Sequence, residues 1–428
     1  MDEVTAAAPE DLAEAAARRG WPDGLLQRAL DLRVPRRQLR RWLAQDWTTT
    51  EFVELRLQWH ERLTFGALRG REATLADNEA FADLFANAPE EVGEWEIYTE
   101  RSPNAFAQFR LQENVNVLVI EEQGVLIAAC SFSHRKTIVA GKRILVRYGQ
   151  ALRVRKEHRR QGYGDQVRSL PWGVYAARNA HGQYDIMRSQ NFAVVNWWKK
   201  YVPEFWDDVP QREGEVPGIP VTVLQYPARP FDPSASLRAG GGAAGIRKAR
   251  PADVARCVGL INRTHRGLDL FRPYSADFLS NRLDDGTWGD RPTEAWHGEW
   301  SHVYGWDDYY VLEEGGRVVA CAGLWDRGRD MRDRWRHTET GEEKVIAVTA
   351  VLDFGFEPGG ENGMARLIAF LISETHRLGR DYLAVPLDHL PALAACLEEY
   401  EPVPETRALR WGLPEPPITR PHIDLAYW

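Results

Sequence analysis

The feature that most constrains the fold is an internal repeat within the 428 residues. Residues 71–77, REATLAD, resemble residues 247–253, RKARPAD, and residues 119–130, VIEEQGVLIAAC, resemble residues 311–322, VLEEGGRVVACA. In the second pair each copy has an apolar run, two glutamates, a turn with glycine and another apolar run, which predicts a β-hairpin. Equivalent segments in the same order indicate two similar units in one chain.

A third pair of segments follows the hairpins. Gly162 and Gly164 open a stretch with apolar residues on one helical face, and the sequence YDIM comes after it. Gly363 and Ala365 open a similar stretch that Gly379 ends, and DYLAV comes after that. Helical spacing followed by a short apolar run predicts a helix and then a strand. Each half therefore predicts the order helix, hairpin, strand, helix, strand.

These patterns divide the chain into four parts. Residues 1–66 are predicted to form a helical leader, because they contain two short amphipathic stretches that begin with proline. Residues 67–230 are predicted to form the first α/β unit and residues 246–428 the second. Between them, residues 231–245 are small and rich in glycine, which predicts a flexible linker. The expected fold class is α/β, with a mixed (α+β) sheet in each unit.

Composition narrows the class of protein. Hydrophobic residues make up 44% and charged residues 27% of the chain, which is ordinary for a folded protein in water. No apolar run approaches the ~20 residues that cross a bilayer, and the N-terminus lacks signal-peptide features, so we expect a cytoplasmic protein that does not contact membranes. The net charge of −8 gives no general attraction to nucleic acid. The four cysteines are scattered, which predicts neither a disulfide framework nor a zinc site.

Residues 154–167, VRKEHRRQGYGDQV, combine positive charge with glycine between a strand pattern and a helix pattern. Such a turn leaves the first N–H groups of the helix unpaired and directed at one point, where an anion can bind. Gly162 and Gly164 allow a ligand to approach the backbone closely. The formal charge comes from Arg155, Lys156, Arg159 and Arg160. The pattern predicts a pyrophosphate site, although a tight turn with solvated arginines would use the same residues.

The spacing Arg159-x-x-Gly162-x-Gly164, after a strand that ends at Val154, resembles the acyl-CoA pyrophosphate loop of the GNAT superfamily of N-acetyltransferases. The resemblance covers residues 67–230 well and residues 246–428 weakly, and the helical leader lies outside it. It implies two GNAT-like domains in tandem with an N-terminal helical extension. It also implies acetyl-CoA, or another acyl-CoA, as co-substrate and no metal.

The resemblance further implies which residues would contact the co-substrate. In GNAT enzymes the strand before the loop splays from its neighbour and exposes its backbone to the pantetheine arm. That would place Leu152, Arg153 and Val154 along the arm, and Asn191 corresponds to an asparagine that follows the next strand. The residues expected at the pyrophosphate are Arg159, Arg160, Gln161, Gly162, Tyr163 and Gly164.

The catalytic positions depart from the family pattern. GNAT enzymes tend to have a tyrosine in the helix after that asparagine, near the thiolate, but this sequence has Trp198, whose indole N–H is not acidic enough to protonate a thiolate. Tyr201, one turn later, is the candidate substitute, or else a core aromatic residue. The histone-acetylating branch has a glutamate fourteen residues before the first motif glycine, where this chain has Tyr148. Tyr148 and Tyr201 are therefore the candidate catalytic residues, with water and backbone carbonyls available as the base.

The second copy of the loop, GGENGMA, lacks the cations of the first. Gly360 stands where the motif arginine would be, Glu357 and Glu361 flank the loop, and no lysine or arginine occurs before Arg366. Negative charge beside a pyrophosphate is unfavourable. We therefore expect the second half to keep the fold without the co-substrate, so that one chain binds one acyl-CoA.

Two functions fit these features. The first is transfer of an acyl group from acyl-CoA to a primary amine of a small molecule or peptide, with nucleic acid not expected as a partner. The alternative is a non-catalytic acyl-CoA sensor whose leader binds a partner or DNA. Residues 35–45, PRRQLRRWLAQ, suit either a DNA-recognition helix or a helix whose Leu39, Trp42 and Leu43 face a small core of the leader. Neither the acceptor nor the oligomeric state follows from the sequence.

Two further segments have alternative interpretations. Residues 287–310 hold four tryptophans, which could form an aromatic wall of an acceptor pocket or a loop packed on the sheet. The chain ends in RPHIDLAYW, which has the pattern of a terminal edge strand. In the tandem acetyltransferases that modify aminoglycosides, the C-terminal carboxylate enters the first domain as a base, and Trp428 would hold that position here.

Overall fold

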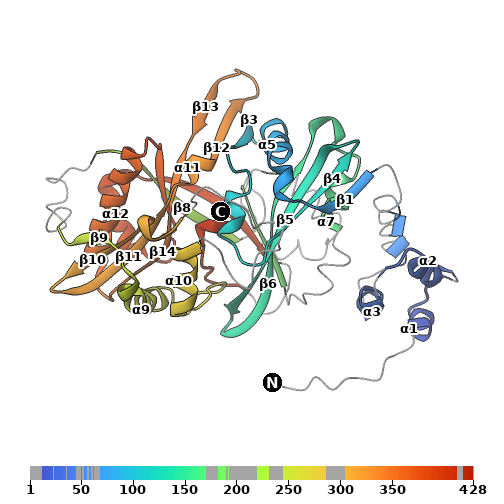
Figure 1. Cartoon of the computed structure of the whole chain (residues 1–428), viewed down its shortest axis with the longest axis horizontal. Helices are drawn as coiled ribbons and strands as arrows, with labels where there is room; N and C mark the ends of the chain where they lie inside the picture. Colours follow the sequence, from blue (N-terminus) through green and yellow to red (C-terminus); the bar gives the residue numbers. More distant parts are fainter. Residues whose placement is uncertain are drawn as a thin grey trace.

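The computed structural model describes residues 12–44 apart from 23 and 35, single positions between 50 and 61, and residues 68–169, 182–188, 191, 219–230, 244–285, 304–411 and 418–427. In these parts of the chain the strands form one 12-stranded mixed sheet and a second, 4-stranded sheet. Helices flank the large sheet, and helices of the leader lie at one end of the molecule (Figure 1). The expected α/β fold class with an N-terminal helical extension is confirmed.

The first half of the large sheet contains the predicted hairpin, formed by its second and third strands. Its strands are β1 (Leu68–Glu72), β4 (Asn116–Glu122), β5 (Val125–Val139), β6 (Lys142–Val154) and β7 (Gly182–Arg188). Neighbours are antiparallel except β6 and β7, which are parallel. The turn between β4 and β5 has positive φ at Gln123 (51°) and Gly124 (83°), as a two-residue hairpin turn requires. The helices of this half are α5 (Asn78–Asn87), α6 (Ala107–Arg110) and α7 (Tyr163–Ser169).

The second half repeats this order. Its strands are β9 (Ile246–Lys248), β10 (Tyr309–Glu314), β11 (Arg317–Trp325), β14 (Val348–Phe356) and β15 (Tyr382–Val385), of which β14 and β15 are parallel. Its helices include α9 (Val254–Thr264), α10 (Ala276–Asp285), α12 (Glu361–Arg377) and α13 (Pro391–Ala395). Gly379, just after α12, has a φ of 67°, so the predicted helix end is confirmed.

The two copies of the Arg–Asp segment make equivalent contacts. Arg71 forms a bidentate ion pair with Asp77 (2.7 and 2.7 Å), and Arg247 does the same with Asp253 (2.8 and 3.0 Å). In both copies the aspartate also accepts a backbone N–H from the residue three positions earlier, which fixes the start of the following helix.

The last strand of each half pairs with the other half. β8 (Ile219–Pro227) lies beside β15, and β16 (Val403–Trp411) lies beside β7, while β8 and β16 pair with each other. The predicted boundaries at residues 230 and 246 divide the sequence. In the sheet, however, a strand from each side of these boundaries pairs with strands from the other side. The two halves therefore share one hydrogen-bonded sheet.

The small sheet also joins the halves. It consists of β2 (Glu90–Val92), β3 (Trp95–Arg101), β12 (Met331–His337) and β13 (Glu343–Ile346), in the order β13-β12-β3-β2. The central pair runs from Arg101 opposite Met331 to Trp95 opposite His337. Figure 1 shows β3, β12 and β13 above the junction of the halves. A short helix, α11 (Arg327–Asp330), leads into β12.

The leader has a core of its own. Its helices include α1 (Leu12–Arg18), α2 (Leu25–Asp31) and α3 (Arg36–Ala44). Leu39, Trp42 and Leu43 of α3 are buried with apolar residues of α1 and α2, so the interpretation of α3 as a helix that faces a small core is confirmed. No helix in the described parts of the chain is both long and apolar enough to span a bilayer.

The C-terminal segment is not the predicted edge strand. Residues 418–427 form one isolated bridge, Pro421 to Asp269, and a short 3-10 helix, Leu425–Tyr427. The carbonyl of Ala426 accepts a hydrogen bond from the Gln112 side chain (2.6 Å), so this segment lies between the two halves. Pro421 has no N–H to donate to a ladder, and the backbone N–H of Thr419 donates to the Asp269 carboxylate (2.8 Å) rather than to a neighbouring strand. Trp428 lies outside the described residues.

Candidate active site

The candidate site lies where β6 and β7 part. The two strands pair from Val146 opposite Gly182 to Gly149 opposite Asp185, and β6 then continues to Val154 beside β5 alone. One edge of β6, along Leu152, Arg153 and Val154, therefore has no strand partner among the described residues. The splay that the family resemblance implied is present, and it leaves backbone N–H and C=O groups available to a ligand.

A β-bulge bends β6 at this point. Ser131 pairs with Gln150 and Ala129 with Arg153, so β6 has one extra residue, and Ala151 has a φ of 55°. The second half has the same bulge in β14, where Asp353 has a φ of 50°. A bulge changes the direction of the backbone at the end of a strand. The residue with positive φ is not a glycine in either bulge, so the sequence does not indicate them.

The loop after β6 presents unpaired backbone donors. The N–H groups of Arg160, Gln161, Gly162 and Gly164 form no hydrogen bond with any other residue that the structure describes. Gly162 has a φ of 79° and Arg160 a φ of 63°, so the chain curls around these amides. A Cβ atom at Gly164 would lie 3.8 Å from the side chain of Val154, in ordinary contact. Consecutive amides in such a turn make an anion-binding concavity.

The loop cations are engaged by acids of the same half. Three of the four pair with carboxylates of α5, β2 and β3: Arg155 with Asp83, Lys156 with Glu96 (3.1 Å) and Arg159 with Glu91 (2.5 Å). The Arg159 guanidinium also donates to the carbonyl of Pro89. In each pair one side chain is exposed, since Asp83, Lys156 and Glu91 are 51%, 62% and 59% exposed, so water screens these pairs in part.

The side chains of two residues predicted to bind the pyrophosphate make contacts within the protein instead. The Tyr163 side chain is buried (4% exposed) against apolar residues of β1, β4 and β5, so only its backbone faces the loop. Gln161 donates its side-chain amide to the carbonyl of Glu157 (3.2 Å) and thereby closes the turn. Asn191 is buried, and its side-chain amide donates to Glu90 (2.6 Å).

Tyr148 lines the cavity of the site and packs against a core tyrosine. Tyr148 is 2% exposed, and its ring centroid lies 4.9 Å from that of Tyr184 on β7. Burial raises the pKa of Tyr184 to about 12, so this hydroxyl stays protonated. Tyr201 and Trp198 lie outside the described residues.

A cavity opens between the parted strands and the small sheet. It is lined by residues 148–153 of β6, by residues 185–188 of β7, and by charged side chains that include Glu90, Arg101, Arg327 and Asp333. Burial alone would raise the pKa of Glu90, but the charges of Arg153 and Arg188 lower it. Glu90 is therefore an ionised structural carboxylate and a weak base.

Sequence reasoning missed a buried charge network at this cavity. Arg188, at the end of β7, donates to Asp333 on β12 (3.0 Å) and to Glu405 on β16 (3.1 Å). Arg407 on β16 also binds Glu405 (2.8 Å). Arg188 is 145 residues from Asp333 and 217 from Glu405 in the sequence, so no local pattern indicates this network.

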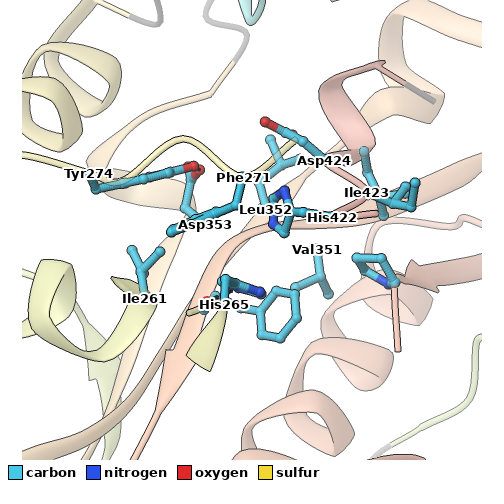
Figure 2. Close-up of a pocket in the computed structure, with 13 residues that line it drawn as sticks. Ile261, His265, Phe271, Tyr274, Val351, Leu352, Asp353, His422, Ile423 and Asp424 are labelled. Carbon is cyan, nitrogen blue, oxygen red and sulfur yellow. Dashed lines mark hydrogen bonds between the residues drawn. The ribbon is translucent and has the colours of Figure 1, made fainter. Parts of the chain in front are cut away.

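The equivalent cleft in the second half is filled (Figure 2). His265, at the end of α9, donates through Nε2 to the carbonyl of Phe354 (2.9 Å), one residue after the bulge. The Asp353 carboxylate accepts hydrogen bonds from Tyr274 (2.6 Å) and from Tyr304 (2.9 Å). His422, from the C-terminal segment, enters the same pocket. The remaining space, about 10 Å³, holds about one water molecule.

Comparison with known proteins supports the fold. No protein-family model matches the chain, and no curated protein is similar to it in sequence. The structure of Saccharomyces cerevisiae N-myristoyltransferase with bound myristoyl-CoA matches with a TM-score of 0.51, 12% identity, and coverage of 81% of this chain and 79% of that chain. This chain has the fold of a tandem GNAT-like protein.

Other solved structures are similar to this chain. A second structure of the yeast N-myristoyltransferase has a TM-score of 0.51 and 11% identity, with 81% of this chain and 82% of that chain covered. A GCN5-related N-acetyltransferase from Sphaerobacter thermophilus has a TM-score of 0.48 and 15% identity, with 84% of this chain and 98% of that chain covered. The two yeast structures confirm the expected resemblance at the level of fold.

Proposed function

We propose that this protein is an acyl-CoA-dependent N-acyltransferase, with acetyl-CoA as the donor and a primary amine of a small molecule or peptide as the acceptor. A cytoplasmic location and a single acyl-CoA per chain are part of the proposal. One observation carries it: β6 and β7 part beside a loop with unpaired amides, in a fold shared with an enzyme solved with bound myristoyl-CoA.

The geometry suggests where each part of the donor would lie. The pyrophosphate would bind the amides of residues 160–164, helped by Arg159. The pantetheine arm would complete the free edge of β6 along Leu152, Arg153 and Val154. Its thioester would then face the cavity at the bulge, where the backbone polarises the carbonyl.

The reaction needs few protein groups. A neutral amine attacks the thioester carbonyl, the tetrahedral intermediate expels the CoA thiolate, the nitrogen loses its proton to a water molecule held by backbone carbonyls, and the thiolate takes up a proton from water or a nearby hydroxyl. Tyr201 stays the proposed hydroxyl group near the thiolate, and Tyr148 stays the candidate at the position where other members have a glutamate base. Trapping the reactants in the correct orientation is the main contribution of the protein.

The second half supports the proposal of one acyl-CoA per chain. Its splayed cleft is occupied by His265 and His422, and its bulge carbonyl is already hydrogen-bonded. Arg366, the first cation after the second loop, is paired with Glu314 (2.8 Å). A second thioester would have to displace these groups.

The test measures binding and turnover separately. We expect calorimetry to give one acetyl-CoA per chain and a panel of amines to show free-thiol release. Gly164→Trp is expected to abolish binding, because a tryptophan fills the loop. The matched control is Gly259→Trp on α9, where an added Cβ meets nothing within 4 Å. Met364, in the second loop, is unsuitable as a control because it is fully buried in the core.

Binding of acetyl-CoA without thiol release from any amine would favour the sensor function. No binding, with intact fold, would contradict both functions.

A further inference from the structure

Three arginines around the first-half cavity have unpaired nitrogen atoms. Arg101, Arg153 and Arg327 all line the cavity, and the Nε atom of each is buried without a hydrogen-bond partner among the described residues. Arg101 is 5% exposed, and the side chains of Arg153 and Arg327 are 14% and 13% exposed. Buried guanidinium donors are normally satisfied, so three unsatisfied ones at one cavity indicate a missing partner.

Arg101 is the strongest case. Its other nitrogens donate to neutral oxygens, the carbonyl of Ala105 (3.1 Å) and the side chain of Gln108 (3.3 Å), and it has no ion pair with any described residue. The ring of Phe85, 4.4 Å from the guanidinium carbon, compensates part of the charge. A buried cation without a counter-ion is costly, because the loss of hydration is not offset.

The nearby carboxylates are already shared. Arg153 is 3.4 Å from Glu90, which also binds Asn191, and Arg327 is 3.8 Å from Asp333, which also binds Arg188. Five arginines line the cavity: Arg101, Arg153, Arg188, Arg327 and Arg407. The acids that line it are Glu90, Asp185 and Asp333.

The arginines also repel one another. Burial, followed by the charges of Arg153 and Arg327, lowers the pKa of Arg101 to about 9. The guanidinium carbons of Arg101 and Arg153 lie 4.4 and 5.1 Å from the ring centre of Phe85, so both cations share one phenyl ring. An anion in the cavity would relieve this repulsion and complete the hydrogen bonding of the three Nε atoms.

We propose that this cavity is a carboxylate subsite, in which Arg101, with Arg153 and Arg327, binds an acid group of the substrate close to the reacting thioester. The inference rests on the proposed acyltransferase function. The acid group belongs either to the acceptor, which is then an amino acid or another amine with a carboxylate, or to the acyl group, which is then a dicarboxylic acyl chain. The planar guanidinium fork fits a carboxylate in both cases.

The location explains why both halves are needed. Arg101 ends β3 and lies opposite Met331 of β12, while Arg153 comes from β6 and Arg327 from α11. The subsite therefore exists only where the small sheet joins the halves. A degenerate second half would be retained because it supplies Arg327 and holds β3 in place.

The experiment uses the full-length protein in two kinetic arms. In the first, acetyl-CoA is combined with pairs of amines that differ only in a carboxylate, such as an amino acid and its amide. In the second, a neutral amine is combined with succinyl-CoA or with acetyl-CoA. We expect at least a tenfold preference in kcat/KM for the acidic partner in one arm. That arm identifies the source of the carboxylate.

The variant Arg101→Met should remove this preference while activity with the neutral partner is kept within a few-fold. The Arg101→Met protein is expected to fold, because an apolar side chain replaces a buried cation that has no counter-ion. If Arg101→Met does not fold, Arg327→Met is the second variant. The matched control is Arg69→Met on β1, whose side chain is 73% exposed.

Binding provides a readout that does not depend on turnover. Calorimetry with succinate alone should detect binding to the unliganded protein and its loss in Arg101→Met but not in Arg69→Met. Succinate binding without any acyl transfer would contradict the acyltransferase and keep the subsite. Transfer without preference for an acid, together with no succinate binding, would overturn the subsite.

Discussion

Reversing one charge in the acyl-CoA loop is the sharpest test of the proposed donor site. Arg159 pairs with Glu91 (2.5 Å), and the two side chains are 27% and 59% exposed. An exposed pair contributes at most about 1 kcal/mol, whereas a charge-assisted contact to phosphate contributes about 1.5 to 3 kcal/mol. Exchanging one for the other gives Arg159 about 1 to 2 kcal/mol of binding free energy.

Arg159→Glu removes this gain and adds repulsion between the new carboxylate and the pyrophosphate. At a separation of about 6 Å and an effective dielectric constant between about 20 and 80, that repulsion is about 1 to 3 kcal/mol. The sum is on the order of 3 kcal/mol, so we expect Arg159→Glu to weaken acetyl-CoA binding on the order of a hundredfold.

Titration calorimetry of acetyl-CoA into both proteins measures the difference. The matched control is Arg317→Glu in the second half, which changes the net charge equally and whose side chain is 67% exposed. It should leave the dissociation constant within about twofold. A thermal melt checks that Arg159→Glu still folds, since Arg159 also holds the carbonyl of Pro89. An Arg159→Glu protein that folds and binds acetyl-CoA with unchanged affinity would refute the role of the loop.

Three other changes have expected outcomes. Glu91→Gln frees Arg159 from its pair and should tighten acetyl-CoA binding about twofold to fivefold in calorimetry, while weaker binding would argue that Glu91 orients the arginine. Arg282→Leu leaves the Asp353 carboxylate buried without its 2.6 Å partner and should lower the free energy of unfolding by about 3 to 5 kcal/mol in urea; a loss below about 1 kcal/mol would mean that the pair is not buried in solution. Burial lowers the pKa of His389 from 6.5 to about 4, so the unfolded chain binds more protons than the folded one between these values. Stability should then fall by up to about 1.4 kcal/mol per pH unit as the pH decreases through this window, and His389→Gln should make the fall shallower, a difference that urea unfolding at pH 7 and pH 5 would detect.

Local sequence patterns determined the elements of this protein. The hairpins follow from apolar alternation around Gln123–Gly124 and Gly315–Gly316, and the end of α12 follows from Gly379. The spacing from Arg159 to Gly164 indicated the anion loop, because strand, glycine turn and helix are contiguous in the chain. These features depend on residues within about ten positions of one another, so short-range spacing was sufficient.

The tertiary structure alone decided what surrounds that loop. The exchange of β8 and β16, the small sheet that joins β3 to β12, and the bulges at Ala151 and Asp353 have no local signal. The three unpaired arginines became a group only because β3, β6 and α11 meet at one cavity. Pairing between strands that are far apart in the sequence depends on the packing of the complete sheet. A local sequence pattern does not show which strand edge a distant segment will cover.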